Sequence, residues 1–111
     1  MDSPVSKLME ELYRTRMMPK AELARRSGMS TVYLHQIFSG KRNPSRDRVL
    51  CFCLDLGATV EETQRLLEQG SLARLYARNR RDAILIHALA HKTPLQEVND
   101  ILFQAGEETL C

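Results

Sequence analysis

The chain has 111 residues and a mass of 12.7 kDa, which fits one compact domain or a small domain with an extension, and not two independent cores. With 43% apolar and 27% charged residues, its composition excludes a disordered chain. Sixteen basic and fourteen acidic residues give a net charge of only +2, so the total charge does not by itself indicate a nucleic-acid partner.

The localisation that we expect is cytoplasmic. The longest uninterrupted apolar run, residues 49–54, is too short to cross a membrane, and the N-terminal residues lack the basic and apolar regions of a signal peptide. The three cysteines, Cys51, Cys53 and Cys111, cannot all pair within one chain and are too few for a disulfide scaffold. We therefore expect reduced thiols.

Glycines and N-capping residues divide the chain into helical segments. Ser3, Ser30 and Ser45 are expected N-caps, because a hydroxyl can accept a hydrogen bond from the first turn of a helix. Residues 59–62 and 93–96 match the capping box, the second with Pro94 at the first helical position. No segment alternates with period two, so we predict an all-α fold without strands. The predicted helices are 4–17, 20–27, 31–38, 46–56, 60–69, 80–91 and 94–105.

Residues 20–38 combine two short helices with a turn at Gly28. The small Ala24 allows a second helix to approach closely, and glycine adopts the left-handed conformation without steric cost. The apolar contacts that would fix the angle between the two helices come from Leu23, Met29, Leu34 and Ile37. This spacing is typical of a helix-turn-helix.

The sequence resembles the phage-repressor-type (XRE, lambda-repressor-like) helix-turn-helix regulators of bacteria in the run KAELARRSGMSTVYLHQIFSGKRNPSRDRVLCFCLDLGATVEE. The resemblance extends over residues 5–69. It implies a five-helix DNA-binding domain, residues 1–70, whose third helix, Thr31–Phe38, reads the major groove of double-stranded DNA. It departs from the family at Ser27, where an apolar residue is frequent, and at Val32, where a polar reader is usual.

The resemblance also implies which residues contact DNA. Gln36 can pair with adenine through two hydrogen bonds, whereas Val32 and the methyl group of Thr31 can pack on a thymine methyl. The candidate base readers are Thr31, Val32, His35 and Gln36. The candidate backbone contacts are Lys20, Ser30, Lys41, Arg42, Asn43 and Arg46.

We expect no metal site, cofactor or enzymatic activity. Cys51 and Cys53 are two residues apart and would point in nearly opposite directions on a helix, so Cys53 is expected in the core. His87 and His91 have a chelating spacing, but the glutamate that the zinc-protease pattern requires is absent, and His91 fits a helix C-terminal cap better. The sequence contains no glycine-rich phosphate loop and no nucleophile elbow.

Residues 71–111 are expected to form an extension that ends in a helical hairpin. Residues 71–79 fit either a short helix or a packed connector, and the extension begins with a second basic cluster, Arg74, Arg78, Arg80 and Arg81. The helix 80–91 is apolar around most of its circumference, so it must pack on more than its hairpin partner. We therefore expect this helix to dock on the DNA-binding domain, to form a homodimer interface, or to do both.

The charge is unevenly distributed along the chain. Residues 14–48 hold nine basic and two acidic residues, which places most of the positive charge in and around the helix-turn-helix. The leading interpretation is a sequence-specific DNA-binding transcriptional regulator, with repression favoured over activation because the chain has no room for a sizeable effector domain. The alternative is a protein-interaction adaptor, or an antitoxin-like module, that uses the same fold without a main DNA role.

Overall fold

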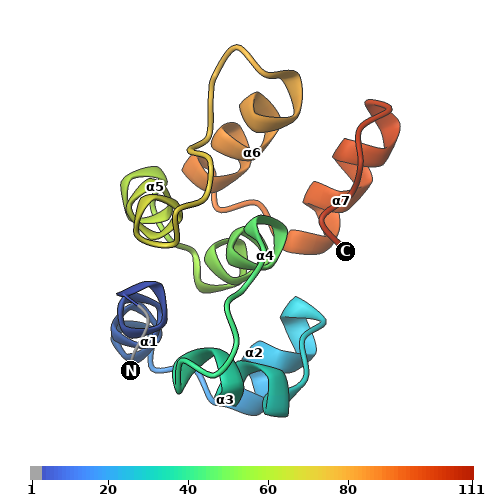
Figure 1. Ribbon diagram of the computed structural model, residues 1–111. Helices are drawn as coiled ribbons and strands as arrows, with labels where there is room; N and C mark the ends of the chain where they lie inside the picture. The colour runs from blue at the N-terminus through green and yellow to red at the C-terminus, as the bar shows by residue number, and fades with distance from the viewer. Residues whose placement is uncertain (1–3) are drawn as a thin grey trace.

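The computed structural model describes residues 4–111, which form seven α-helices and no strand (Figure 1). The all-α prediction is confirmed, and the second to fifth helices begin and end at the predicted residues. The expected N-cap Ser3 lies outside the described residues. The helices are α1 (Pro4–Arg16), α2 (Lys20–Ser27), α3 (Thr31–Phe38), α4 (Arg46–Leu56), α5 (Val60–Gln69), α6 (Arg80–Ala90) and α7 (Leu95–Gln104).

Side-chain caps begin α3, α4 and α5 as the sequence predicts. The hydroxyl of Ser30 accepts the Tyr33 N–H at 3.0 Å, and that of Ser45 accepts the Arg48 N–H at 3.3 Å. Residues 59–62 form a complete capping box. Each cap satisfies a backbone donor that has no partner inside its helix.

The predicted capping box at residues 93–96 is wrong. α7 begins at Leu95 with Pro94 as its N-cap, and no side chain caps it. The Thr93 N–H instead donates to the Ala88 carbonyl at 3.0 Å, so Thr93 closes the end of α6. α6 itself is capped by Asn79, whose side chain accepts the Asp82 N–H at 3.0 Å.

The turn after α5 also differs from the expected pattern. Gly28 and Gly57 take the left-handed conformation after their helices, with φ of 76° and 68°. Gly70 has a φ of −87°, and the left-handed position falls on Ser71, with a φ of 55°.

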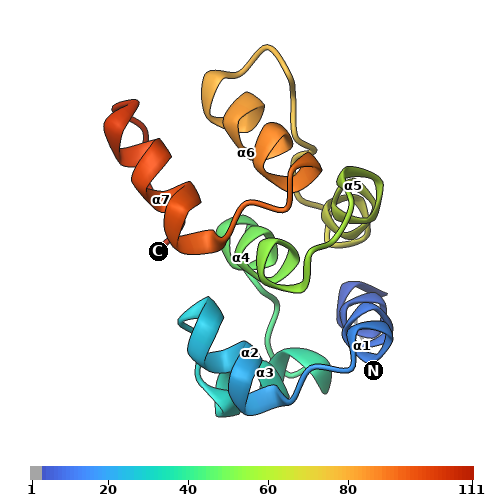
Figure 2. The same cartoon turned by 180° about the vertical axis from the view of Figure 1, so that it is seen from behind.

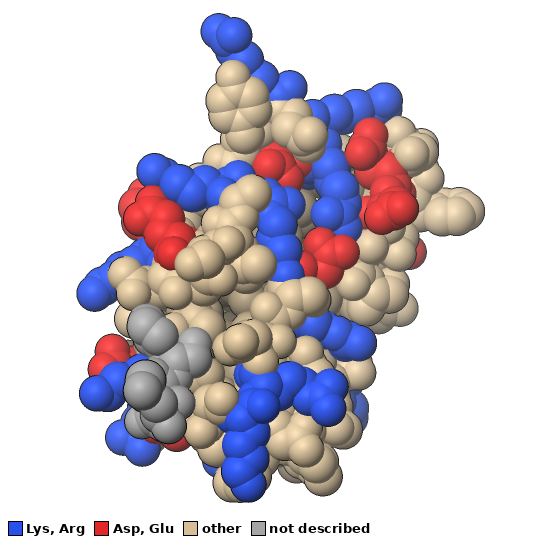
Figure 3. Space-filling view, in the orientation of Figure 1, with Lys and Arg blue, Asp and Glu red and all other residues tan. Residues whose placement is uncertain are grey.

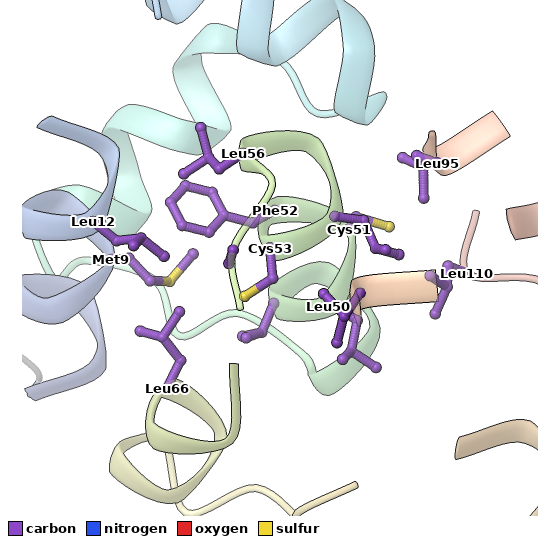
Figure 4. Close-up of a cluster of buried hydrophobic side chains, with 14 of the residues drawn as sticks. Met9, Leu12, Leu50, Cys51, Phe52, Cys53, Leu56, Leu66, Leu95 and Leu110 are labelled. Atoms are coloured by element: carbon purple, nitrogen blue, oxygen red, sulfur yellow. The ribbon is translucent and has the colours of Figure 1, made fainter. Parts of the chain in front are cut away.

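α4 lies at the centre of the molecule. Its residues from Val49 to Leu56 are all buried, and α2, α5, α6 and α7 pack around it. The views from front and back show α1, α2 and α3 on one side of α4, and α6 and α7 on the other (Figures 1 and 2). In the core, Phe52 and Cys53 point toward α1 and α5, whereas Cys51 points toward α7 (Figure 4).

Two ion pairs dock α6 on α4. The guanidinium of Arg46 contacts both carboxylate oxygens of Asp82, at 3.2 and 3.0 Å, and that of Arg81 contacts both oxygens of Asp47, at 3.1 and 3.2 Å. The second oxygen of Asp82 also accepts the Tyr76 N–H at 2.9 Å. The attraction within each pair and the satisfied hydrogen bonds offset the cost of desolvating these charges, and the pairing fixes how α6 lies on α4.

Residues 71–79 form a packed connector and no helix. Leu75 is buried, and the side-chain amide of Gln64 on α5 bonds both its N–H and its carbonyl, at 2.8 and 2.9 Å. The backbone of the connector is therefore held by a side chain in place of helical hydrogen bonds. Together with the ion pairs, this contact shows that the extension packs on the rest of the chain.

α4 buries the carboxylate of Asp55, and one of its two oxygens, Oδ2, has no hydrogen-bond partner among the described residues. The residue is 6% exposed. Desolvation raises the pKa of Asp55 from 3.8 to about 6, although the charge of Arg26 opposes that shift.

Ionisation of Asp55 should therefore destabilise the fold as pH rises from about 4 to about 6. The folded state binds this proton more tightly than the unfolded state, so the free energy of unfolding falls across that interval, by on the order of 2 kcal/mol. Chemical denaturation of wild type and Asp55→Asn at several pH values measures the effect. The variant should lose this fall, whereas Asp100→Asn, at an exposed position on α7, should keep it. Parallel stability curves for wild type and Asp55→Asn would contradict the assignment.

Candidate nucleic-acid interface

α2 and α3 form a helix-turn-helix whose inner faces are buried. Leu23 and Ala24 of α2, Met29 of the turn, and Leu34 and Ile37 of α3 all lie in the core, as the sequence predicts. Gly28 makes the turn in the left-handed conformation, which favours glycine.

Ser27 is compatible with its buried position because its hydroxyl is satisfied locally. The hydroxyl donates to the Leu23 carbonyl at 2.7 Å and accepts the Met29 N–H at 3.3 Å. A polar residue at this usually apolar position therefore ties the end of α2 to the turn, so the departure from the family pattern does not weaken the motif.

One face of α3 is left open to solvent. Thr31, Val32 and His35 are exposed, and Gln36 is half-buried with no described residue bonded to its side-chain amide. Val32 is 65% exposed. We call these four residues the outer face of α3.

The loop between α3 and α4 folds back against the end of α3. The backbone N–H groups of Lys41 and Arg42 both donate to the Gln36 carbonyl, at 2.9 and 3.2 Å, while both side chains and that of Asn43 are exposed. Two basic side chains are thereby held beside the outer face of α3. In Figure 3, Lys and Arg side chains form a band through the lower part of the molecule, and the acidic side chains visible in that part lie at its left edge.

Tyr33 organises part of this basic surface. The guanidinium carbons of Arg42 and Arg48 lie 5.3 and 5.6 Å from the centre of its ring, within the range of cation–π attraction. Sequence reasoning missed Tyr33 and Arg48, since nothing in their spacing links a residue of α3 to one of α4. Their contact arises only because the loop reverses the chain.

The remaining candidates at this end have different environments. Lys20 is exposed at the start of α2, with its ammonium 5.5 Å from the centre of the Phe38 ring, and Ser30 is exposed at the start of α3. The first backbone N–H groups of a helix have no partner within it, so both helix ends present free donors beside these residues.

The structure argues against Arg46 as a phosphate contact. Besides its two bonds to Asp82, its guanidinium donates to the carbonyls of Ala73 and Arg74, at 2.8 and 3.2 Å. Four of its five donors are thus occupied within the chain. Arg46 joins α4 to the extension and is not free for DNA.

The second basic cluster lies at the opposite end of the molecule from α3. Arg74, Arg78 and Arg80 are carried by the connector from α5 to α6 and the start of α6, which lie at the top of Figure 1, whereas α3 lies at the bottom. The molecule is 38 Å long. Arg74 also pairs with Glu68 at 3.0 Å, and Arg81 is engaged with Asp47. This cluster does not extend the basic surface around α3.

The two C-terminal histidines interact with each other and with the backbone. Their rings stack with centres 4.0 Å apart, and Nδ1 of His91 lies 2.8 Å from the His87 carbonyl oxygen, so His91 caps the end of α6 as expected. Within residues 4–111, no three His, Cys, Asp or Glu side chains are grouped as a metal site would require. Over the same residues, no helix is long and apolar enough to span a membrane.

Comparison with protein families places the helix-turn-helix in a known group. The family described as helix-turn-helix matches residues 9–50, which run from the middle of α1 through α2, α3 and the loop into α4. Comparisons with curated proteins and with solved structures gave no match. Residues 9–50 are therefore similar to a helix-turn-helix family of DNA-binding regulatory domains, in line with the resemblance of the sequence.

Proposed function

We propose that the protein is a sequence-specific regulator of transcription that inserts α3 into the major groove of double-stranded DNA. The observation that carries the proposal is the outer face of α3, which is exposed, carries hydrogen-bonding side chains and is bordered by basic residues. A helix of this width fits the major groove, where each base pair presents its own pattern of donors and acceptors.

The outer face of α3 supplies the base contacts in this proposal. The side-chain amide of Gln36 can donate to and accept from one adenine, and its half-buried position restricts its orientation. Val32 and the methyl group of Thr31 would pack on thymine methyl groups, which the exposed side chain of Val32 can reach. His35, one turn after Thr31, is the fourth reader.

The surroundings of α3 supply the phosphate contacts. Ser30 and the first N–H groups of α3 form one anion site, and Lys20 at the start of α2 forms another. Lys41, Arg42 and Asn43 of the loop follow the backbone on the other side of α3, with Arg42 held over Tyr33.

The two parts of the chain have different roles in this proposal. Residues 1–70 form the DNA-contacting domain, and residues 71–111 form an extension packed on the side away from α3. A regulator that reads DNA through α3 acts most simply by occupying its site, so repression is favoured over activation.

Loss of a loop cation should weaken binding to DNA of every sequence. Lys41→Ala should lower the affinity for a mixed-sequence duplex by roughly three- to tenfold at low salt and reduce the slope of log affinity against log salt by about 1. Arg78→Ala is the matched control, because it removes an exposed cation from the far end of the molecule. Fluorescence anisotropy over a salt series measures both.

The two variants separate the DNA proposal from its alternative. Equal effects of Lys41→Ala and Arg78→Ala would contradict the placement of DNA on α3. Weak binding that neither variant changes would instead support a protein-interaction adaptor or an antitoxin-like module.

A negative charge at the start of α3 should block DNA without harming the fold. Aspartate caps a helix as well as serine does, so Ser30→Asp should keep the thermal midpoint, yet its carboxylate would repel the phosphate and lower affinity by about tenfold. Asn79→Asp makes the corresponding change at the N-cap of α6, at the other end of the molecule, and should leave affinity unchanged. Unaltered affinity in Ser30→Asp would rule out a phosphate at that site.

We also propose that the protein binds DNA as a homodimer through α6 and α7. Ile101 of α7, which is 40% exposed, and the exposed Ala83 of α6 line a groove of about 390 Å³ between α6 and α7, together with Ile84 and Ala88. Exposed apolar residues beside an apolar groove favour a self-complementary contact. Another protein partner on the same surface is the alternative occupant.

Sedimentation at micromolar concentration tests the dimer. Wild type should sediment as a dimer, and Ile101→Glu should weaken association by at least about tenfold because it would bury a charge in the interface. Glu107→Gln provides a control near the same end of α7. A monomer mass for wild type, both alone and on DNA, would contradict the homodimer.

A further inference from the structure

Residues 107–111, which follow α7, fold back onto the molecule and are held there by hydrogen bonds. Arg81 donates to the carbonyls of Glu108 and Thr109, at 2.9 and 3.3 Å, and Leu110 is buried. The Leu110 N–H donates to Oδ1 of Asn99 on α7 at 2.8 Å. The position of this segment is therefore fixed from both α6 and α7.

This anchoring places Cys111 beside Cys51. Nδ2 of Asn99 lies 3.2 Å from Sγ of Cys111, so one amide holds both Leu110 and Cys111. Cys51 on α4 points its sulfur toward the space between α4 and α7 where Leu95 and Leu110 lie, and Cys53 points its sulfur away from that space (Figure 4). Cys51 lies one turn after Asp47 on α4, and Arg81 joins Asp47 to the carbonyls of Glu108 and Thr109, so the C-terminal segment lies along the face of α4 that carries Cys51.

The two thiols have different environments. Cys51 is fully buried, whereas Cys111 is exposed. Burial raises the pKa of Cys51, and the neighbouring Cys111 raises it further, so Cys51 is a protonated thiol at neutral pH. Oxidants in solution therefore meet Cys111 first.

We propose that Cys51 and Cys111 form a redox modification site, at which a peroxide converts the two thiols into an intramolecular disulfide. The thiolate of Cys111 attacks hydrogen peroxide, which yields a sulfenic acid at Cys111 and releases hydroxide. The sulfur of Cys51 then attacks the sulfenic sulfur, its proton leaves with the departing hydroxyl as water, and the S–S bond forms. In sum, two thiols and one peroxide give one disulfide and two waters.

The disulfide would link the extension to the central helix of the DNA-binding domain. It closes a loop that runs from residue 51 to residue 111 and contains α5, α6 and α7. A cross-link over so long a loop restricts the unfolded chain strongly, so oxidation stabilises the fold. The outer face of α3 contributes neither cysteine, so the proposal does not depend on the DNA-binding role.

Counting of free thiols after oxidation tests the site. The reduced protein is treated with a small excess of hydrogen peroxide, quenched, denatured and alkylated with N-ethylmaleimide. Oxidised wild type should take up one maleimide in place of three, and a non-reducing tryptic digest should contain residues 49–65 linked to residues 93–111. The thermal midpoint should rise by at least about 5 °C and return to its original value with dithiothreitol.

Three variants identify the partners. Cys111→Ser, at an exposed position, should keep the fold and abolish the link and the thermal shift, and Cys51→Ala should abolish the link as well. Cys53→Ala is the matched control, since it removes a buried cysteine from the same helix and should leave the link intact. Loss of two thiols in Cys111→Ser, or oxidation of wild type only to a linked dimer or to a sulfinic acid at Cys111, would overturn the proposal.

Discussion

The burial of α4 is the constraint on which the rest of the structure depends. A helix whose residues from Val49 to Leu56 are all buried must be surrounded, and a chain of this size can surround it only by using most of its other helices. α2, α5, α6 and α7 pack around α4. α3 is held mainly by α1 and α2, so it sits at the edge of the core and keeps one face free.

The uneven distribution of charge in space explains how a nearly neutral chain presents a basic surface. Arg46, Asp47, Arg81 and Asp82 neutralise one another within the fold. The cations that remain near α3 are Lys41, Arg42 and Arg48, with Lys20 at the start of α2. The net charge of +2 is therefore a poor guide to this surface, because charges of opposite sign are separated in space.

The sequence was sufficient to predict helix boundaries that depend on residues close together in the chain. Gly28, the caps at Ser30 and Ser45, and the capping box at residues 59–62 act within a few residues, so they located α2 to α5 correctly. The sequence was insufficient to predict contacts between segments that are far apart in the chain. The pairing of Arg46 with Asp82, the contact of Tyr33 with Arg48 and the approach of Cys111 to Cys51 depend on tertiary packing, and the box at residues 93–96 failed because Thr93 bonds to α6.

Selection of bound sequences from a random duplex pool, carried out in parallel with wild type and Gln36→Ala, tests the central claim that α3 reads DNA bases. Wild type should enrich a short motif, and the variant should enrich the same motif with relaxed preference at one base pair, equivalent to about 1–3 kcal/mol of lost discrimination. Identical motifs from both proteins would contradict base reading by Gln36. Failure of wild type to enrich any motif would contradict the account as a whole.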